Sequence, residues 1–532
     1  MAWNFGDILD AIAQVIPPDA PAFVHGMRRI SWGETGRRTN NLAAALIRRG
    51  SRPRDKVAFY MRNRPEYCET LAASFKARLT HVNVNYRYKP EEVFYIFDNS
   101  DAQTVVYGAE FRDIVTQIRP RLKKVQTFVE VTDGGTAADF AVDFETLANE
   151  GNGKALKIER SPQDEFFIYT GGTTGMPKGV IWTHDDLRET SLIALRKLGP
   201  VPENLDGLIA SIKQVGPGGR LLPACPLMHG TGLLMAMNTM LAGGSVITLG
   251  HHSFSAQEMW KAVEDNKAMT LVIVGDAFAK PMLTALEEGN YDTSSIVNMV
   301  SSGVMWSREV KQGLLRHIPQ AILVDSFGSS EAVGFGTSMM TKDGEVATAK
   351  FTISDRVKVF DAEDRPVEPG SGVPGIVAMP QPIPLGYYKD EKKTAETFKT
   401  IAGIRYSMPG DWCIVEKDGT LTLLGRGSAC INTAGEKVYP EEVEEALKLH
   451  PCVEDALVVG VPDDKWGQSI TAVIVASGDF DEEGIRLHVR ERLAGYKTPK
   501  RVLIAGVPLR APNGKADYKS ALAFAKQELG IA

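Results

Sequence analysis

The stretch FFIYTGGTTGMPKGVIWTH, residues 166–184, is the most informative part of this 532-residue chain. Its apolar start, FFIYT, predicts a buried strand, and VIWTH predicts a second strand after the glycines. Glycines let successive backbone N–H groups converge on anionic oxygens, and threonine hydroxyls and Lys178 add further donors. We therefore predict a strand–loop–strand unit that cradles a polyphosphate, in preference to a glycine-rich hairpin without a ligand.

The same stretch is not a Walker phosphate loop. That motif reads G-x-x-x-x-G-K-[ST] and lies between a strand and a helix. Here Lys178 is followed by Gly179, and the segment after it has the pattern of a strand. The sequence thus excludes a P-loop NTPase, although it keeps the prediction of a phosphate site.

Composition limits the class of protein. Hydrophobic residues make up 43% and charged residues 24%, which excludes a mostly disordered chain. The formal charge of −6 gives no support for a nucleic-acid partner. The five cysteines are dispersed, so we expect buried thiols in a reducing compartment rather than disulfides or a zinc site. No signal peptide or bilayer-length apolar run is present, which predicts a cytoplasmic protein without stable membrane insertion and leaves peripheral contact open.

Alternating segments predict an α/β fold. Residues 56–63 and 81–85 have strand character, and residues 64–79 between them carry apolar residues at helical spacing. This alternation predicts mixed β-sheets flanked by helices in a large composite N-terminal domain, residues 1–425. Residues 426–532 then predict a small, mobile α+β domain with two helices and three strands.

Further motifs follow the glycine-rich stretch in a recognisable order. They are Pro226-Leu-Met-His-Gly230, Ser302-Gly-Val304, Asp325-Ser-Phe-Gly-Ser-Ser-Glu331, Gly410-Asp411, Gly425-Arg426 and Pro512-Asn-Gly-Lys515. Together with residues 170–179 they resemble the adenylate-forming superfamily of acyl-CoA synthetases, peptide-synthetase adenylation domains and luciferases. Gly171 replaces the usual serine and Ser330 the usual threonine, and both replacements suit their places.

The resemblance implies roles for named residues. Lys515, Glu331, Thr174 and His229 would be catalytic, and Glu331 and Thr174 would hold Mg²⁺. ATP or AMP would contact Thr170, Gly171, Gly172, Thr173, Thr174, Gly175, Lys178, Ser302, Gly303, Val304, Asp325, Ser326, Phe327, Gly328, Ser329, Ser330, Asp411, Arg426 and Lys515. Coenzyme A would pass along Thr433, Ala434, Gly435 and Lys437, and the acid would lie against Leu227, Met228, His229, Met235, Val304 and Met305.

The resemblance also implies a two-step reaction and a domain rotation. A carboxylate would attack ATP to give acyl-AMP and pyrophosphate, and a thiol would then displace AMP. Rotation would occur at a hinge about residues 426–430, where Ala429 replaces the Asp or Lys of many members. Ala434 stands where a second glycine is common, and a Cβ there would cost on the order of 1 kcal/mol at positive φ, which would bias the rotation.

The apolar, methionine-rich stretches near His229 indicate a hydrophobic acid. We predict a medium- or long-chain fatty acid, or a steroid or terpenoid side chain, joined to CoA by an enzyme that acts alone or as a dimer. Alternatives are an acyl-AMP ligase that loads a carrier protein, an aryl-acid CoA ligase and a luciferase-like oxygenase. A non-catalytic nucleotide-binding protein is disfavoured because Lys178, Glu331, Asp411, Arg426 and Lys515 are all present.

Overall fold

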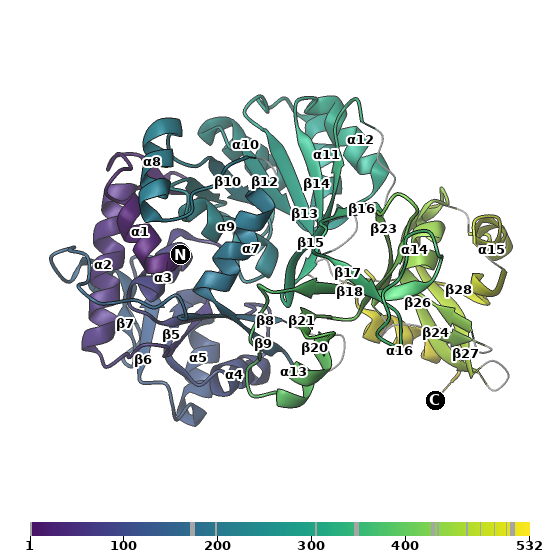
Figure 1. Ribbon diagram of the computed structural model, residues 1–532, viewed down its shortest axis with the longest axis horizontal. Coiled ribbons are helices and arrows are strands. Elements are labelled where there is room, and N and C mark those ends of the chain that lie inside the picture. Colours follow the sequence, from purple (N-terminus) through teal and green to yellow (C-terminus); the bar gives the residue numbers. More distant parts are fainter. Residues whose placement is uncertain are drawn as a thin grey trace.

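The protein is a mixed α/β structure with a large N-terminal part and a small C-terminal part, in agreement with the predicted fold class. In Figure 1 the N-terminal elements lie at the left, and the C-terminal elements form a lobe at the right. Strand β23 (Leu421–Arg426) and helix α14 (Pro440–Lys448) pack together where the two parts meet. The computed structural model describes residues 3–170, 176–196, 199–303, 306–344, 350–426, 431–433, 436–463, 467–478, 480–493, 495–506, 508–510 and 516–531.

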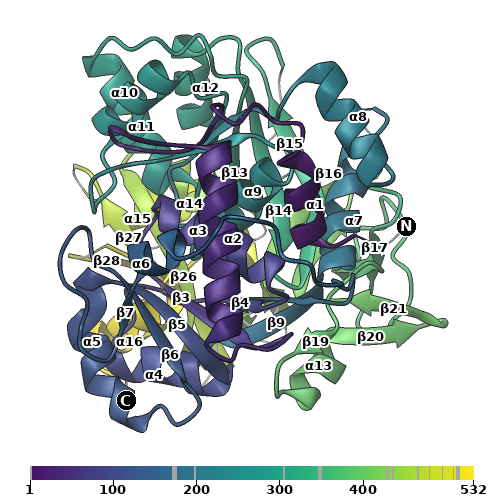
Figure 2. The ribbon, with the colours of Figure 1, turned by 90° about the vertical axis from the view of Figure 1, so that its left-hand side faces the viewer.

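Five parallel strands form one sheet of the N-terminal part. Their order is β4 (Thr80–Asn83), β3 (Lys56–Tyr60), β5 (Ala102–Gly108), β6 (Thr127–Val131) and β7 (Val142–Asp143). The connecting helices are α3 (Pro65–Lys76), α4 (Pro90–Asn99), α5 (Arg112–Ile118) and α6 (Phe144–Asn149). Figure 2 shows helix α2 (Trp32–Arg48) in front of these elements, packed on α3 and α6. The predicted alternation is confirmed, but α3 ends at Lys76 rather than Leu79, because Arg78 takes a left-handed φ of 61°.

The largest sheet holds the strands that end at the predicted nucleotide motifs. Its parallel half runs β1 (Pro21–His25), β11 (Ser245–Thr248), β10 (Arg220–Pro223), β12 (Thr270–Ile273), β13 (Asn298–Ser302) and β14 (Ile322–Ser329), with β2 (Arg28–Ser31) antiparallel at the edge. Helices α10 (Ala256–Asn266), α11 (Asp276–Glu288) and α12 (Arg308–His317) share a core with these strands. Because ligands bind at the carboxyl ends of parallel strands, the ends of β13 and β14 are a natural site.

Beyond β14 the same sheet becomes antiparallel. The order continues through β15 (Ala332–Met340), β16 (Lys350–Ile353), β23, β22 (Asp411–Val415), β18 (Pro374–Pro380), β21 (Ile404–Ser407) and β20 (Phe398–Ile401), and β17 (Lys358–Phe360) pairs with β18. The turn 416–420 joins β22 to β23, as the sequence KDGT predicts. This half of the sheet therefore leads the chain from the end of β14 towards the C-terminal part.

The C-terminal part is a five-stranded sheet with helices. Its strands are β24 (Ile431–Thr433), β25 (Glu436–Val438), β26 (Val453–Asp463), β27 (Gly467–Ala476) and β28 (Arg501–Ile504), and its helices are α14, α15 (Glu482–Arg490) and α16 (Tyr518–Glu528). Helix α14 begins with Pro440, followed by Glu441 and Glu442 in the first turn, where fixed φ and acidic side chains favour a helix start. The predicted elements of this region are therefore present.

The expectation that the cysteines are buried has a mixed outcome. Cys68, Cys225 and Cys413 are buried as expected, but Cys452 is only half-buried, because it lies in the turn after α14 where its Sγ contacts His450 Nδ1 at 3.0 Å. Cys430 lies outside the described residues.

Among the helices that the structure describes, none is both long enough and apolar enough to cross a bilayer.

Candidate active site

The glycine-rich stretch lies between two strands. Strands β8 (Glu165–Thr170) and β9 (Lys178–Thr183) pair antiparallel with Thr170 opposite Lys178, and β19 (Gly386–Tyr387) pairs with the other edge of β9. The predicted strand–loop–strand arrangement is thus confirmed. Gly171, Gly172, Thr173, Thr174 and Gly175, which form the loop itself, lie outside the described residues.

Lys178 forms an ion pair with Asp390 at the mouth of this hairpin. Asp390 also caps helix α13 (Glu391–Thr397), since its Oδ1 accepts a hydrogen bond from Lys393 N at 2.9 Å. The hydrogen bond from Lys178, followed by that from the Lys393 backbone, lowers the pKa of Asp390. The two side chains are 35% and 26% exposed, so this lysine is accessible to phosphate oxygens.

Glu331 is oriented by three neighbours. Its Oε1 accepts a hydrogen bond from the Tyr387 hydroxyl at 2.6 Å, its carbonyl accepts one from Ser407 Oγ at 2.7 Å, and its N–H donates to Ser329 Oγ at 3.2 Å. Within the described part of the chain, Oε2 has no hydrogen-bond partner. A single oriented carboxylate suits Mg²⁺, which uses one or two protein carboxylates together with substrate phosphates. Consistently, the described residues contain no cluster of three or more His, Cys, Asp or Glu that could hold a metal unaided.

Two asparagines fix the loop that precedes His229: the buried Asn83 links this loop to the hairpin, and the half-buried Asn63 binds the loop itself. Asn83, at the end of β4, donates to Tyr169 O at 2.9 Å and to Met228 O at 2.7 Å, and accepts from Tyr169 N at 2.7 Å. Asn63, after β3, accepts from Leu227 N at 2.6 Å. Because Tyr169 precedes the predicted phosphate loop, Asn83 fixes the predicted phosphate and acyl segments relative to each other.

The predicted acyl segment leads into helix α9 (Gly230–Met240). His229 is its N-cap residue and is half-buried. Leu227 and Met228 are 1% exposed, whereas Met235 is partly buried and packs against the main core. Several of the apolar side chains of this region are therefore core residues. Val304 and Met305 lie outside the described residues.

The ends of β13 and β14 bring the predicted adenine residues side by side. Ser301 pairs with Asp325 and Ser302 with Ser326, and Gly303 has a φ of 86°, a value that favours glycine. Ser329 and Ser330 follow at the turn to β15, and Gly328 lies beside them. This arrangement places the backbone of both segments at one edge of the sheet.

Phe327 is mostly buried at this edge. Its ring is 7% exposed, and it packs on Phe335 at 5.2 Å and on Phe351 at 5.3 Å between ring centroids. Stacking of Phe327 on adenine stays a prediction.

Asp325 has a partner that the sequence did not reveal. Lys311 of α12 forms an ion pair with Asp325 Oδ2, and the side chains are only 8% and 14% exposed. Burial raises the pKa of Asp325 and the charge of Lys311 opposes that rise. The carboxyl group is thus fixed on one side by a buried cation.

The predicted ribose pair lies across two antiparallel strands. Asp411 of β22 is opposite Arg426 of β23, and residues in this relation have Cβ atoms about 5 Å apart. Asp411 is 7% exposed. The Gly410 and Gly425 that precede them have φ values of 98° and 105°, so both glycines serve backbone positions that other residues rarely adopt.

The C-terminal part contributes the flanks of the predicted catalytic lysine. Lys515 lies outside the described residues, as do Ala434, Gly435 and the side chain of Lys437, while Thr433 is buried in β24. On either side of residues 511–515, Arg510 forms a β-bridge with Ala516, and its guanidinium contacts both oxygens of Asp455 at 2.7 and 2.8 Å. The flanks of the Lys515 segment are therefore anchored to β26.

The structure adds residues to the site that sequence reasoning missed: Asn63, Asn83, Lys311, Tyr387 and Asp390. No clear signal existed for Asn83, because its strand also holds the polar residues Thr80 and His81. No local spacing predicts the others, because their partners lie far along the chain or on another element.

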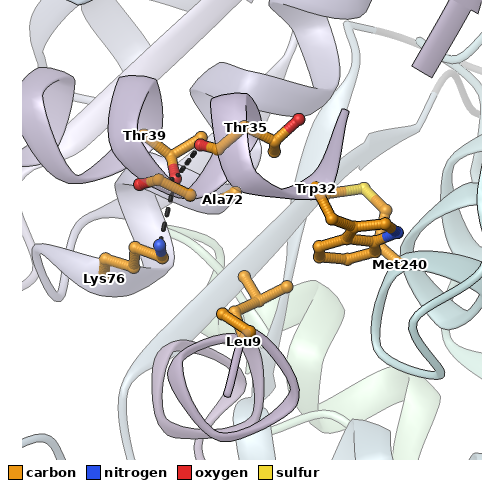
Figure 3. Close-up of a pocket in the computed structure, with 9 residues that line it drawn as sticks. Leu9, Trp32, Thr35, Thr39, Ala72, Lys76 and Met240 are labelled. Atoms are coloured by element: carbon orange, nitrogen blue, oxygen red, sulfur yellow. Dashed lines mark hydrogen bonds between the residues drawn. The ribbon is translucent and has the colours of Figure 1, made fainter. Parts of the chain in front are cut away.

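An enclosed cavity elsewhere in the core is not part of this site. It lies between α1 (Phe5–Ile12), α2 and α3, and has a volume of about 10 Å³ (Figure 3). Lys76 Nζ donates to Thr39 Oγ1 at 3.0 Å beside it, and Trp32 Nε1 and Thr35 Oγ1 are buried without a partner in the part of the chain described. The lining is mostly apolar with a few polar atoms, and the volume is about that needed for one water molecule.

Comparison with known proteins gives matches along almost the whole chain. The model of the AMP-binding enzyme family matches residues 10–388, and that of the AMP-binding enzyme C-terminal domain matches residues 442–515. The 3-oxocholest-4-en-26-oate–CoA ligase of Rhodococcus rhodochrous is 40% identical over 100% of this chain and 97% of its own. The medium/long-chain-fatty-acid–CoA/3-oxocholest-4-en-26-oate–CoA ligase of Mycobacterium marinum is 38% identical over 98% of this chain and 96% of its own.

Solved structures share the fold at lower identity. An anthranilate CoA ligase in complex with anthranoyl-AMP has a TM-score of 0.83 at 20% identity, covering 100% of this chain and 98% of its own. A Mycobacterium tuberculosis fatty acyl CoA synthetase has a TM-score of 0.73 at 22% identity, covering 99% of both chains. At these identities the likeness concerns the fold.

Proposed function

This chain belongs to the AMP-binding enzyme family, and on that premise we propose that it is an AMP-forming ligase that joins a hydrophobic carboxylic acid to coenzyme A. The observation that carries the proposal is 38–40% identity, along 98–100% of the chain, to relatives named as CoA ligases for a steroid side-chain acid and for fatty acids. The acid of this enzyme is accordingly a medium- or long-chain fatty acid or a steroid or terpenoid side chain.

The proposed reaction has two balanced steps. A carboxylate oxygen of the acid attacks the α-phosphorus of ATP, so that an acyl–O–P bond forms and pyrophosphate leaves. The sulfur of CoA then attacks the acyl carbon, a thioester forms, AMP leaves, and the thiol proton passes to solvent. Both steps bring anions together, so positioned cations and dipoles supply most of the catalysis.

The described residues suit the first step. Lys178 exchanges Asp390 for phosphate oxygens, and Tyr387 keeps Glu331 oriented towards them. Mg²⁺ held by Glu331 and Thr174 would neutralise phosphate charge. Asp411 accepts hydrogen bonds from the ribose hydroxyls, and Lys515 approaches the attacked phosphate, as the motifs imply.

The acid contacts the segment 227–235 in this proposal. Asn83 holds that segment against the strand that enters the predicted phosphate loop, and Asn63 binds Leu227 N, so the carboxylate and the α-phosphate are presented in a defined relation. Met235 supplies an adaptable apolar side chain on α9.

A substrate panel tests the proposal. The purified chain with ATP, Mg²⁺ and CoA is offered fatty acids of several lengths, a steroid side-chain acid, benzoate, acetate and amino acids, and AMP release and thioester are measured. We expect the long hydrophobic acids to give the highest kcat/KM. Preference for acetate or an amino acid would refute the substrate class, and product that stops at acyl-AMP with CoA present would favour the carrier-loading alternative.

We further propose that residues 1–425 and 426–532 act as two domains about a hinge at residues 426–430, of which 427–430 lie outside the described part. Ala434 biases the rotation between the two half-reactions. Pre-steady-state rates of both half-reactions in Ala434→Gly test this, and unchanged rates would contradict it. A cytoplasmic location and a dimeric assembly remain proposals.

A further inference from the structure

We infer that Lys311 determines which nucleobase the enzyme accepts, because it keeps the Asp325 carboxylate as a hydrogen-bond acceptor for a 6-amino group. This inference rests on the proposed function, in which Asp325 lies beside adenine. Lys311 does not itself touch the nucleotide, so it is a positioning residue that acts through Asp325.

The contacts of Asp325 leave one oxygen available. Lys311 Nζ binds Oδ2, and Oδ1 has no hydrogen-bond partner in the part of the chain that the structure describes. The side chain keeps 14% exposure. Because Oδ2 is held by a cation on α12, the carboxylate cannot turn freely, and Oδ1 is the oxygen that a ligand can reach.

The residues that the neighbouring strands place beside Asp325 are serines. Strand β13 places Ser301 beside Asp325, and strand β15 places Ser338 on the other side. Ser301 Oγ accepts a hydrogen bond from Gly275 N at 2.9 Å. Neither serine carries a charge, so they do not set the protonation state of the carboxyl group.

The charged neighbours act in opposite directions. Asp276, at the start of α11, raises the pKa of Asp325 together with burial, and Lys311 lowers it. Asp276 lies 3.9 Å from Lys280 and accepts from Ser307 N at 3.0 Å. Lys311 is therefore the cation that favours the ionised form of Asp325, and its removal from beside this buried carboxyl group favours the protonated form.

Protonation of Asp325 would reverse its preference between a 6-amino and a 6-oxo group. An ionised carboxylate accepts hydrogen bonds, so it fits the 6-amino group of adenine and repels the 6-oxo group of hypoxanthine or guanine. A protonated carboxyl can donate to that oxo group. The Lys311–Asp325 pair consequently favours ATP over ITP through the charge of one side chain.

The experiment compares ATP with ITP in Lys311→Met, using the full chain and pyrophosphate release with a saturating acid. We expect the wild-type ratio of kcat/KM for ATP to that for ITP to change less between about pH 6 and pH 9 than the ratio of the variant, because the Lys311 cation opposes protonation of Asp325. In Lys311→Met the ratio should fall about tenfold or more at the acidic end and recover at the alkaline end. Lys311→Arg should restore the wild-type ratio.

Lys76→Met is the matched control, because Lys76 is also a buried lysine but lies in the core of the N-terminal part. It should lower stability and leave the ATP to ITP ratio unchanged. Equal loss with both nucleotides in Lys311→Met, with a ratio independent of pH, would overturn the inference and leave Lys311 a structural residue.

A second variant keeps the test decisive if Lys311→Met does not fold. Asp325→Asn offers both a donor and an acceptor, so its ratio should fall towards unity at every pH, and retention of the wild-type ratio would refute the inference. The two proposals also fail differently. If the wild-type protein forms no acyl-AMP with any acid, the proposed function is refuted. Calorimetric binding of ATP and ITP without acid still tests whether Lys311 sets the preference for ATP.

Discussion

Two ion pairs in the proposed site differ in how much water reaches them. Lys178 and Asp390 are 35% and 26% exposed, whereas Lys311 and Asp325 are 8% and 14% exposed. A pair near water exchanges partners at little cost, but a buried pair that loses one member leaves a charge with a large desolvation penalty. In the proposed function the exposed Lys178 would therefore act as a movable cation for phosphate, and the buried Lys311 as a fixed support for Asp325.

The largest expected effect concerns the exposed pair. In Lys178→Met, kcat/KM for ATP should fall about 10²- to 10³-fold, because a cation is lost where negative charge develops. The free energy of unfolding should change by less than about 1 kcal/mol, since the pair is near water. Steady-state kinetics and urea unfolding measure the two quantities. Lys393→Met, which changes an exposed lysine of helix α13 near Asp390, is the control, and activity retained in Lys178→Met would remove the proposed contrast.

Breaking the buried pair should lower the free energy of unfolding more than breaking the exposed pair. Lys311→Met should lose about 3 kcal/mol of unfolding free energy near pH 8, because the buried Asp325 carboxyl group loses its partner cation. The raised pKa of Asp325 means that the folded variant binds more protons than the unfolded chain, so the loss should be smaller near pH 5.

Urea unfolding at the two pH values checks this prediction. Lys267→Met, from the exposed pair with Asp292, should cost less than about 1 kcal/mol at both. Equal losses in the buried and exposed variants would contradict the distinction between the pairs.

A smaller effect is expected at Glu331, which belongs to neither ion pair. Tyr387→Phe removes the 2.6 Å hydrogen bond to Oε1, so the carboxylate is less well oriented. The Mg²⁺ concentration for half-maximal pyrophosphate release should rise about tenfold, as for other lost partners of metal ligands. Tyr388→Phe, whose hydroxyl binds Asp101, is the matched control and should leave this concentration unchanged. An unchanged Mg²⁺ requirement in Tyr387→Phe would separate Glu331 from the metal.

The smallest effect refines the idea of a movable cation. Asp390→Asn removes the charge that holds Lys178 but keeps an N-cap for α13, so KM for ATP should fall by a factor of about three at unchanged stability. Asp390→Ala also loses the cap and should cost about 1 kcal/mol of unfolding free energy. A rise in KM for Asp390→Asn would show instead that Asp390 positions Lys178 for phosphate.

Sequence patterns predicted the elements of this fold well where local chemistry is strong. The two strands around the glycine-rich loop, the helix that begins at Pro440 and the alternation of the first parallel sheet follow from periodicity and capping. The end of α3 was missed because the left-handed φ of Arg78 has no signal in residue type.

What the sequence by itself determined is the family, the order of the motifs and the residue types at each proposed contact. Only the tertiary structure decided which of these residues have partners. Lys178 and Asp390 are 212 positions apart, and Asn83 reaches residues 86 and 145 positions away. Local spacing carries no information on such distances, because packing of separate elements, and not the chain between them, brings these side chains together and sets how much water remains around each charge.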